Sequence, residues 1–367
     1  MKKITLFTIL LMGLAYATET RVNVITQNSV RFGYANFLLD DEFLIQFYPS
    51  TALRFPAHFT IETPVIRNNV YGNYAYASAF GKYGEFGFGA YAGRDRISDE
   101  ITGFEIVPVD LLGSFNLQNI ALGLNIRLGT FSLDDKENPA TTVNASAIGF
   151  NPSLSFYISE RSGLNIGIPF QFVSGKNKTG NNVNVEYSSN NFGFLGRFYS
   201  MPFIVYALFA TGSENRDNPA TNQNPDLKSS RTVFGAGGGL NLPISEIGFG
   251  IVGLSAVSTS QTNRENNVET KTSNFSIGLL LGGEIKAIRD NIKLRSSFTY
   301  DFLFNRDAQG KSTEIGRLGN LTLGIGYEIG FIRLDAALSS DLLYNGPFFL
   351  TGNTSNFIQS FSILGKF

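Results

Sequence analysis

The chain has 367 residues, a formal net charge of -1, one histidine, no cysteine and no tryptophan. Only 16% of its residues are charged, against about 25% in an ordinary soluble domain, while 43% are apolar and the mean hydropathy is +0.01. The missing cysteine excludes a disulfide scaffold, a zinc ribbon, an iron–sulfur cluster and a thiol enzyme. The charge balance offers no basic field for nucleic acid, and the apolar content is too high for a disordered chain.

Residues 1–17 have the pattern of a secretory signal peptide. Lys2 and Lys3 form a positive start, residues 4–14 form an apolar run, and Ala15-Tyr16-Ala17 provides a small-x-small cleavage site. The run is too short to cross a bilayer as a stable helix, although an N-terminal anchor is the alternative interpretation. The lysine start and the absence of cysteine favour a bacterial envelope protein.

Residues 18–56 come before the first predicted strand. Within them stand the acidic pair Asp40-Asp41, a short apolar run, and then Tyr48-Pro49-Ser50. Taken alone, the two carboxylates could simply start a turn before an extended stretch.

Beyond this segment, apolar residues alternate with small or polar ones. In residues 119–131, one set is Ile120, Leu122, Leu124, Ile126 and Leu128, and the other is Ala121, Gly123, Asn125, Arg127 and Gly129. Residues 163–173, 291–304 and 320–331 alternate in the same way. A period of two places each set on its own face of a β-strand.

The composition of the second face indicates the environment of these strands. A soluble sandwich exposes a charged face, whereas here that face is mostly Gly, Ala, Ser, Thr and Asn. The predicted strands are longer than the usual length of about five or six residues. A strand that crosses a membrane needs about 9–11 residues. Lipid cannot satisfy an open sheet edge, so such strands must close into a barrel. We therefore predict an all-β, transmembrane antiparallel barrel over residues 57–367, with a secreted sandwich or propeller as the alternative.

Turn and loop positions predict the number of strands. The expected strands are 57–65, 71–80, 85–92, 103–115, 119–132, 144–158, 163–173, 185–198, 202–212, 230–242, 247–260, 273–286, 291–304, 319–329, 332–343 and 356–367. This is sixteen strands, or fourteen if Pro64, which is awkward in a ladder, removes the first pair from the wall. Long polar loops such as residues 93–102 and 213–229 alternate with short turns, which predicts that the long side faces out and the short turns face the periplasm.

A few charged residues lie on the small-residue faces of these strands. They are Arg127, Lys293, Arg295, Asp301 and Glu328. A charge that faces lipid at mid-depth would cost about 2–4 kcal/mol, so we expect all five to face the lumen. There they would either set the electrostatics of a pore or form internal salt bridges with the N-terminal segment.

The last strand resembles the C-terminal signature of outer-membrane barrels. Phe361, Ile363 and the terminal Phe367 share one face, although any barrel strand alternates. The resemblance implies recognition by the barrel assembly machinery. It also implies a location in the bacterial outer membrane, in contact with its lipid and lipopolysaccharide.

Two further motifs resemble the fatty-acid transporter (FadL-like) superfamily. Asp40, Asp41 and Pro49 match an acidic pair followed by an Asn-Pro-Ala box, although Tyr48 and Ser50 replace the Asn and the Ala of the box. Residues 324–338 resemble the late hairpin of that family. The resemblance implies that residues 18–56 fold inward as a plug, or hatch, with Asp40, Asp41, Tyr48 and Pro49 in it, and that hydrophobic molecules pass through the barrel.

No catalytic or metal-binding pattern is present. An enzyme of this architecture needs a base, most often histidine, and His58 lies at the start of the first predicted strand. We therefore expect no enzyme, no cofactor and no metal site. Three functions stay open: a FadL-like channel for hydrophobic or small solutes, a general porin, and a non-conducting component of envelope assembly or secretion.

Overall fold

The structure is a computed structural model. It describes residues 35–40, 42–55, 57–64, 76–93, 97–99, 101–136, 140–180, 182–217, 226–265, 268–287, 291–306, 312–317, 321–338 and 358–367. The predicted signal peptide at residues 1–17 and the predicted plug residue Asp41 lie outside the described residues. No helix in these ranges is long and apolar enough to cross a bilayer.

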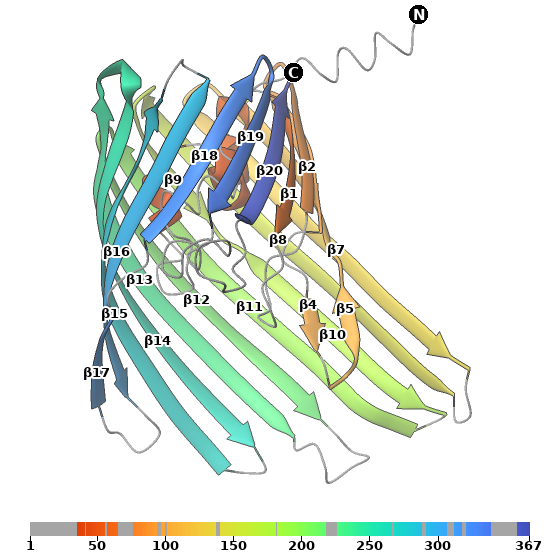
Figure 1. The fold of residues 1–367 in the computed structure, drawn as a ribbon. Coiled ribbons are helices and arrows are strands. Elements are labelled where there is room, and N and C mark those ends of the chain that lie inside the picture. Colours follow the sequence, from red (N-terminus) through yellow and green to blue (C-terminus); the bar gives the residue numbers. More distant parts are fainter. Residues whose placement is uncertain are drawn as a thin grey trace, which may run out of the picture.

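The chain forms one closed antiparallel barrel (Figure 1). Its first strands are β1 (His58–Pro64), β2 (Tyr76–Tyr83), β3 (Phe86–Ala92), β6 (Val109–Leu117), β7 (Ile120–Asp135), β8 (Thr141–Ser159), β9 (Ser162–Gly167) and β10 (Phe170–Thr179). The wall continues with β11 (Asn182–Ser200), β12 (Phe203–Asp217), β13 (Leu227–Ile244), β14 (Gly248–Glu265), β15 (Val268–Lys286) and β16 (Ile292–Arg306). It ends with β17 (Ser312–Arg317), β18 (Leu321–Ile329), β19 (Ile332–Leu338) and β20 (Ile358–Lys366).

These segments make sixteen positions in the wall, as the sequence predicted. β9 and β10 follow one another between β8 and β11, and β17 and β18 both pair with β16, so each couple fills one position. β20 pairs with β1 from His58↔Lys366 to Pro64↔Ser360, which closes the barrel. Pro64 is the last residue of β1, where its missing N–H does not interrupt the ladder, so the first pair stays in the wall.

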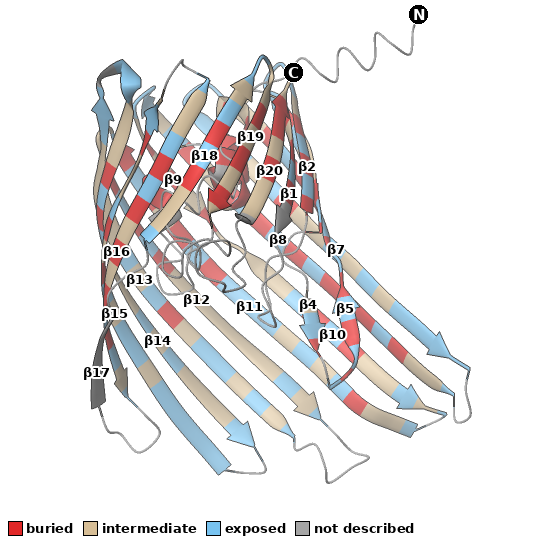
Figure 2. Ribbon diagram, viewed as in Figure 1, coloured by how far each residue is buried: buried red, intermediate tan, exposed pale blue. Residues whose placement is uncertain are grey.

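Burial alternates along the strands because one face of each strand points outward and the other points into the lumen (Figure 2). On β16, Phe302 is 42% exposed and the adjacent Asp301 is 9% exposed. On β14, Leu254 is 60% exposed and Ser255 is 9% exposed. A closed ladder with large apolar side chains on its outer surface is the architecture of a transmembrane β-barrel of the outer-membrane type.

Several strands extend well beyond the predicted boundaries. β10 continues to Thr179 and β11 begins at Asn182, which shortens the loop predicted there to a tight turn. β14 and β15 also continue, to Glu265 and from Val268, through the loop predicted at 261–272. These extensions are polar on both faces and lack the alternation that marks a membrane-embedded strand.

The predicted strand 103–115 is wrong in its first part. β4 (Ile97–Asp99) pairs with β5 (Phe104–Ile106) in a separate two-stranded sheet, and the wall begins only at Val109. Pro108 has no N–H to give to the ladder, so the wall strand cannot continue through it. The β4–β5 hairpin packs on the inner wall: Phe104 and Ile106 lie in one buried cluster with Val143, Ala145, Ala147 and Val173. The predicted outer loop 93–102 therefore lies partly inside the barrel.

Three short 3-10 helices precede the wall: η1 (Ala35–Leu38), η2 (Glu42–Gln46) and η3 (Pro49–Arg54). A fourth, η4 (Ser245–Ile247), is the turn between β13 and β14. The first three lie inside the barrel, near the end that carries the C-terminus and the short turns (Figure 1). We call the described residues 35–40 and 42–55 the inner segment.

The outer surface gives a first prediction. Leu254→Arg on β14 should lower the free energy of unfolding by about 2–4 kcal/mol, because it places a charge against the hydrocarbon. Denaturant unfolding in lipid vesicles measures the change. Leu254→Phe is the matched control and should stay within about 1 kcal/mol of the parent. Equal stability of the Arg and Phe variants would contradict the assignment of this face to lipid.

Candidate functional site

The inner segment packs against two different parts of the wall. Phe37, Leu38, Leu39, Leu44 and Tyr48 join one buried cluster with residues of β11, β12, β13, β14 and β15. Ile45, Ala52 and Phe55 join a second cluster with residues of β2, β3 and β6. Each large apolar side chain buried in this way contributes about 1.5–3 kcal/mol relative to exposure. The segment is therefore held by packing on both sides of the lumen.

A buried ionic group connects the two ends of the inner segment to the wall. Arg54 donates two hydrogen bonds to the Asp40 carboxylate, at 3.2 and 2.8 Å. From β11, Arg197 donates to the carbonyls of Phe37 at 2.7 Å and Leu39 at 3.0 Å, and to Asp40 at 3.3 Å. Arg197 is 0% exposed. A buried guanidinium needs such partners, because an unpaired buried charge costs several kcal/mol.

The electrostatics of this group keep Asp40 ionised. Burial alone raises the pKa of the Asp40 carboxyl, but Arg197 and Arg54 together outweigh it and hold this pKa below its ordinary value. Burial also lowers the pKa of the Arg54 guanidinium, and Asp40 more than compensates, so the pKa of Arg54 is raised. The aromatic ring of Tyr199 lies 5.0 Å from the Arg54 guanidinium and 4.8 Å from that of Arg197, a distance suited to cation–π attraction.

Tyr48 and Pro49 lie where the inner segment meets β8. Pro49 begins η3, a position where its missing N–H costs nothing. Burial raises the pKa of Tyr48, so its phenol stays neutral, and its ring lies 5.8 Å from that of Phe37. The backbone N–H of Ser50 donates to Ser153 at 2.7 Å, and the hydroxyls of Ser50 and Ser155 are 2.8 Å apart. A side chain at Gly123 would overlap the backbone of Ser50, so glycine is required there for the close approach.

Three of the five charged residues predicted to face the lumen lie in one cluster, with three carboxylate or guanidinium partners that the sequence reading missed. Arg295 on β16 contacts Glu284 at 2.6 Å and Asp335 at 2.7 Å. Arg333 contacts Asp335 at 2.9 Å and Glu284 at 3.2 Å. Lys293 pairs with Glu328 at 2.6 Å.

This cluster joins side chains from two strands that are not neighbours in the wall. Arg295 stands on β16 and Asp335 on β19, with β18 between them. A Cβ at Gly326 on β18 would overlap the Arg295 guanidinium and crowd the Asp335 carboxylate. Glycine at this position therefore lets the two side chains meet over the middle strand.

The other two predicted residues lie apart from this cluster. Asp301 is buried on β16, nearer the long-loop end. Arg127 on β7 forms a two-point ion pair with Asp110 on β6, at 2.8 and 3.0 Å. The sequence reading also missed five charged residues that face inward: Asp110, Arg197, Glu284, Arg333 and Asp335. Their inward positions in alternating strands were the signal that could have identified them.

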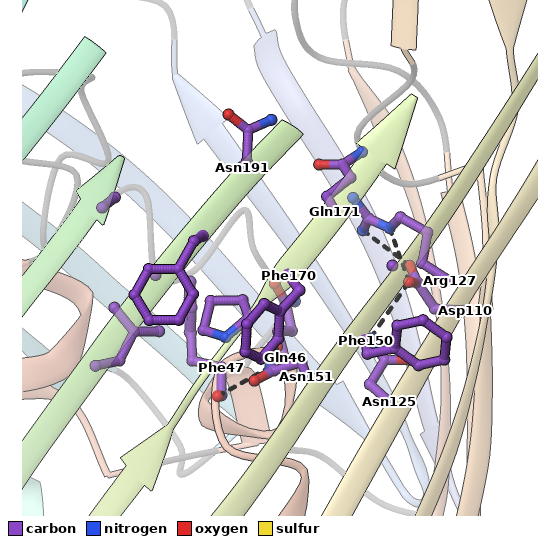
Figure 3. A pocket seen from close by; sticks show the side chains of 16 residues that line it. Gln46, Phe47, Asp110, Asn125, Arg127, Phe150, Asn151, Phe170, Gln171 and Asn191 are labelled. Carbon is purple, nitrogen blue, oxygen red and sulfur yellow. Dashed lines mark hydrogen bonds and ion pairs between the residues drawn. The ribbon is translucent and has the colours of Figure 1, made fainter. Parts of the chain in front are cut away.

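A pocket of about 270 Å³ lies in the lumen beside the inner segment (Figure 3). Gln46 and Phe47 of the inner segment line one side, and Asp110, Asn125, Arg127, Asn151, Gln171 and Asn191 line the walls. Phe150, Phe170 and Phe192 add aromatic surface, and Pro169, Gly193, Leu195 and Ala210 add further apolar surface. The pocket therefore combines several amide side chains with a mostly apolar lining.

The inward-facing residues of β8 show at which depth each part of the lumen contents lies. Ser155, Ser153 and Asn151 contact the inner segment. Gly149 lines the pocket. Ala147, Ala145 and Val143 pack against the β4–β5 hairpin. The pocket thus lies between the inner segment on the short-turn side and the hairpin on the long-loop side.

The hairpin is fixed to the wall by polar contacts as well. Asp99 accepts hydrogen bonds from the backbone and the hydroxyl of Thr102 at 2.7 and 2.6 Å, and it pairs with Arg216 of β12 at 2.5 Å. Asn177 of β10 donates to the Thr102 carbonyl at 3.1 Å. The hairpin therefore has defined contacts with two strands that are far from β4 in sequence.

His58 lies buried on β1, with its ring 4.8 Å from that of Phe80. Within the described ranges, no group of three or more His, Asp or Glu side chains is arranged to hold a metal ion.

The C-terminal residues Phe361 and Ile363 lie on β20, between β19 and β1. Phe361 is opposite Ala336 and Thr63, and Ile363 is opposite Leu334 and Ile61. Phe367 follows the strand, is 48% exposed, and its backbone N–H donates to the Ala57 carbonyl at 3.0 Å. These residues thus stand at the seam where the barrel closes.

No family model and no curated protein matches the sequence. Among solved structures, the chain is similar to a Pseudomonas aeruginosa FadL homologue, with 12% identity, a TM-score of 0.42, and 97% of this chain and 100% of that chain covered. It is also similar to the TodX monoaromatic hydrocarbon channel, with 8% identity, a TM-score of 0.41 and coverage of 95% and 98%.

A third similar structure is BauA, the ferric preacinetobactin receptor from Acinetobacter baumannii. The identity is 12% and the TM-score 0.40; the match covers 77% of this chain and 53% of the receptor, so the chain spans about half of that protein. The barrel assignment rests on the hydrogen-bond register of the chain itself.

Removing the buried guanidinium gives a second prediction. Arg197→Ala should weaken docking of the inner segment by about 2–3 kcal/mol, somewhat less than the loss of a lone buried ion pair, because Arg54 still pairs with Asp40. Trypsin cleavage after Arg54 measures undocking and should accelerate. Arg161→Ala, in an exposed short turn, is the control. Unchanged cleavage in the Arg197 variant would show that packing alone holds the segment.

The lowered pKa of Asp40 gives a third prediction. A carboxyl whose folded pKa is depressed stabilises the docked state above its ordinary pKa of about 3.9, and loses that effect as pH falls through the lower, folded value. Hydrogen-exchange protection of residues 35–55 should thus stay constant from pH 8 to about 4.5 and fall only in stronger acid. Asp40→Asn should be less protected at neutral pH and lack this acid transition. Loss of protection between pH 7 and 5 in the parent would contradict the ion-pair account.

Proposed function

We propose that this protein is a gated channel of the bacterial outer membrane, in which the inner segment is a plug that closes the lumen on the periplasmic side. The observation that carries the proposal is the docking of residues 35–40 and 42–55 inside a sixteen-stranded barrel through Arg197, Asp40 and Arg54. Barrels of this size enclose an aqueous channel unless something fills them. The inner segment fills the end near the short turns.

The polar contacts of the plug are of a kind that can break and re-form. On β8, Ser153 and Ser155 are hydrogen-bonded to Ser50, and Asn151 donates to the carbonyls of Gln46 and Phe47. Such bonds contribute only about 0.5–1.5 kcal/mol each. The ionic group consists of three side chains, Asp40 and Arg54 of the inner segment and Arg197 of β11. A solute that enters from the long-loop side passes the β4–β5 hairpin and then reaches the pocket, directly beside Gln46 and Phe47.

The resemblance of the Asp40–Ser50 region to FadL-like plugs supports the same role. The pocket beside the plug presents phenylalanine rings as well as amide groups, so its lining is compatible with a solute that has an apolar part. We infer further that β20 with Phe361, Ile363 and Phe367 is the strand that the barrel assembly machinery recognises, and that outer-membrane lipid and lipopolysaccharide surround the wall.

The alternative is a non-conducting component of the envelope. The two apolar clusters around the inner segment favour it, because they leave little polar surface at that depth. The two functions differ in whether movement of the inner segment changes conductance.

The absence of cysteine allows a direct test, which is our fourth prediction. Ser50→Cys with Ser155→Cys should form a disulfide, because the two hydroxyls lie 2.8 Å apart. In planar bilayers the oxidised protein should be closed, and reduction should restore the openings of the parent. Ser50→Cys with Ser297→Cys, on the opposite wall, is the matched control and should not respond to reduction. If the parent and the reduced protein never conduct, including after deletion of residues 18–55, the channel function is wrong and the envelope role stands.

A further inference from the structure

We propose that the β4–β5 hairpin is a second gate of the barrel, which covers the lumen pocket from the long-loop side and swings away to admit a solute. The hairpin is defined by residues 97–99 and 101–106. The inference rests on the proposed channel function, to which it adds a gate separate from the inner segment. In the docked state the pocket lies between two closures, the hairpin on one side and the inner segment on the other.

The hairpin and the pocket share one sector of the wall (Figure 1). On β10, Gln171 lines the pocket, and Val173, the next inward residue toward the long loops, packs in the apolar cluster of the hairpin. On β8, Gly149 lines the pocket, and Ala147, again the next inward residue, belongs to the same cluster. The hairpin therefore lies directly above the pocket, on the side from which a solute arrives.

The wall carries a seat of small residues for the two large apolar side chains of the hairpin. Phe104 and Ile106 are 3% and 0% exposed. A Cβ at Gly175 on β10 would overlap the ring of Phe104, and a Cβ at Gly129 on β7 would overlap the side chain of Ile106. Glycine at these two positions therefore gives the hairpin one defined docked position on the inner wall.

An ion pair and a hydrogen bond latch the tip of the hairpin to the wall. The Asp99 carboxylate pairs with Arg216 of β12 at 2.5 Å, and it is held in place by the backbone N–H and the hydroxyl of Thr102. Asn177 of β10 donates to the Thr102 carbonyl at 3.1 Å. Water can take the place of each of these partners when the tip lifts, so the latch is of a kind that can open and close.

The base of the hairpin has the geometry of a hinge. β3 ends at Ala92 and β6 begins at Val109, and these two residues are register partners in the wall. Next to them, Gly93 has a φ of 85°, which favours glycine, and its N–H donates to the Pro108 carbonyl at 3.1 Å. Rotation at these two positions would lift the tip while the ladder between β3 and β6 stays intact.

The second face of the hairpin is turned away from the wall. Val107, which follows β5, is 47% exposed, and Ser98 of β4 is exposed as well. The hairpin therefore has room to move away from its seat on this side. A solute that arrives from the long-loop side meets this face before it reaches the pocket.

The experiment measures how fast a thiol in the pocket is reached from solution. The chain has no cysteine, so Gln171→Cys places a unique thiol in the pocket of the full chain. Its modification by a water-soluble maleimide in detergent is followed by mass spectrometry. Adding Arg216→Ala should raise the rate about tenfold, the change in open population expected when a hydrogen bond to a charged group is lost. Arg231→Ala, an exposed arginine on the neighbouring strand β13, is the matched control and should leave the rate unchanged.

A second variant releases the hairpin without touching the ion pair. Gly175→Val should displace the ring of Phe104 and also speed modification of the pocket thiol. Heat-dependent migration on gels verifies that each variant is a folded barrel, and unchanged trypsin cleavage after Arg54 verifies that the inner segment stays docked. If neither Arg216→Ala nor Gly175→Val speeds the modification, the hairpin does not cover the pocket and the inference is wrong.

The outcomes separate this inference from the proposed function. Modification of the thiol reports access to the pocket whether or not the lumen conducts. Faster modification in variants of a protein that never conducts would leave the gate standing and remove the channel. Conductance of the parent together with unchanged modification rates would do the reverse.

Discussion

The structure depends on one constraint: a backbone surrounded by hydrocarbon must satisfy every N–H and C=O within the protein. The chain meets it by pairing β20 with β1, which leaves no sheet edge in the wall. Closure with sixteen strands creates a lumen too wide for the wall's own small side chains to fill. The inner segment, the β4–β5 hairpin and the charged clusters all occupy space that closure created.

Within that lumen, buried charged side chains form sets of ion pairs. Arg197 is bonded to Asp40 and to two backbone carbonyls, Arg127 is bonded to Asp110, and Arg295 is bonded to Glu284 and Asp335. The first and third sets join elements that are distant in sequence, so they fix a tertiary arrangement as well as neutralising a charge. The first set holds the inner segment, the second borders the pocket, and the third ties the last strands of the wall together.

The sequence predicted the features that repeat and missed those that depend on long-range contacts. Period-two alternation was enough for the barrel, the number of strands and the inward direction of residues such as Arg295, because each strand reports its own two faces. It could not show that Arg295 would meet Asp335, since that contact depends on the order of strands and on Gly326. The extensions of β10 through β15 were missed because strands that project into water have no apolar face to detect. The hairpin at residues 97–106 was read as part of the wall because the effect of Pro108 is visible only once its neighbours' register is known.

The ion pairs that form over Gly326 favour one register of the last strands. A strand that pairs one residue out of step turns every inward side chain toward lipid. For β16 and β19, such a slip would expose Arg295, Arg333 and Asp335 to hydrocarbon, at a cost of a few kcal/mol for each charge. The correct register is the one in which these three and Glu284 neutralise one another. The ion pairs of this cluster therefore favour the observed register of the last strands over a register shifted by one residue.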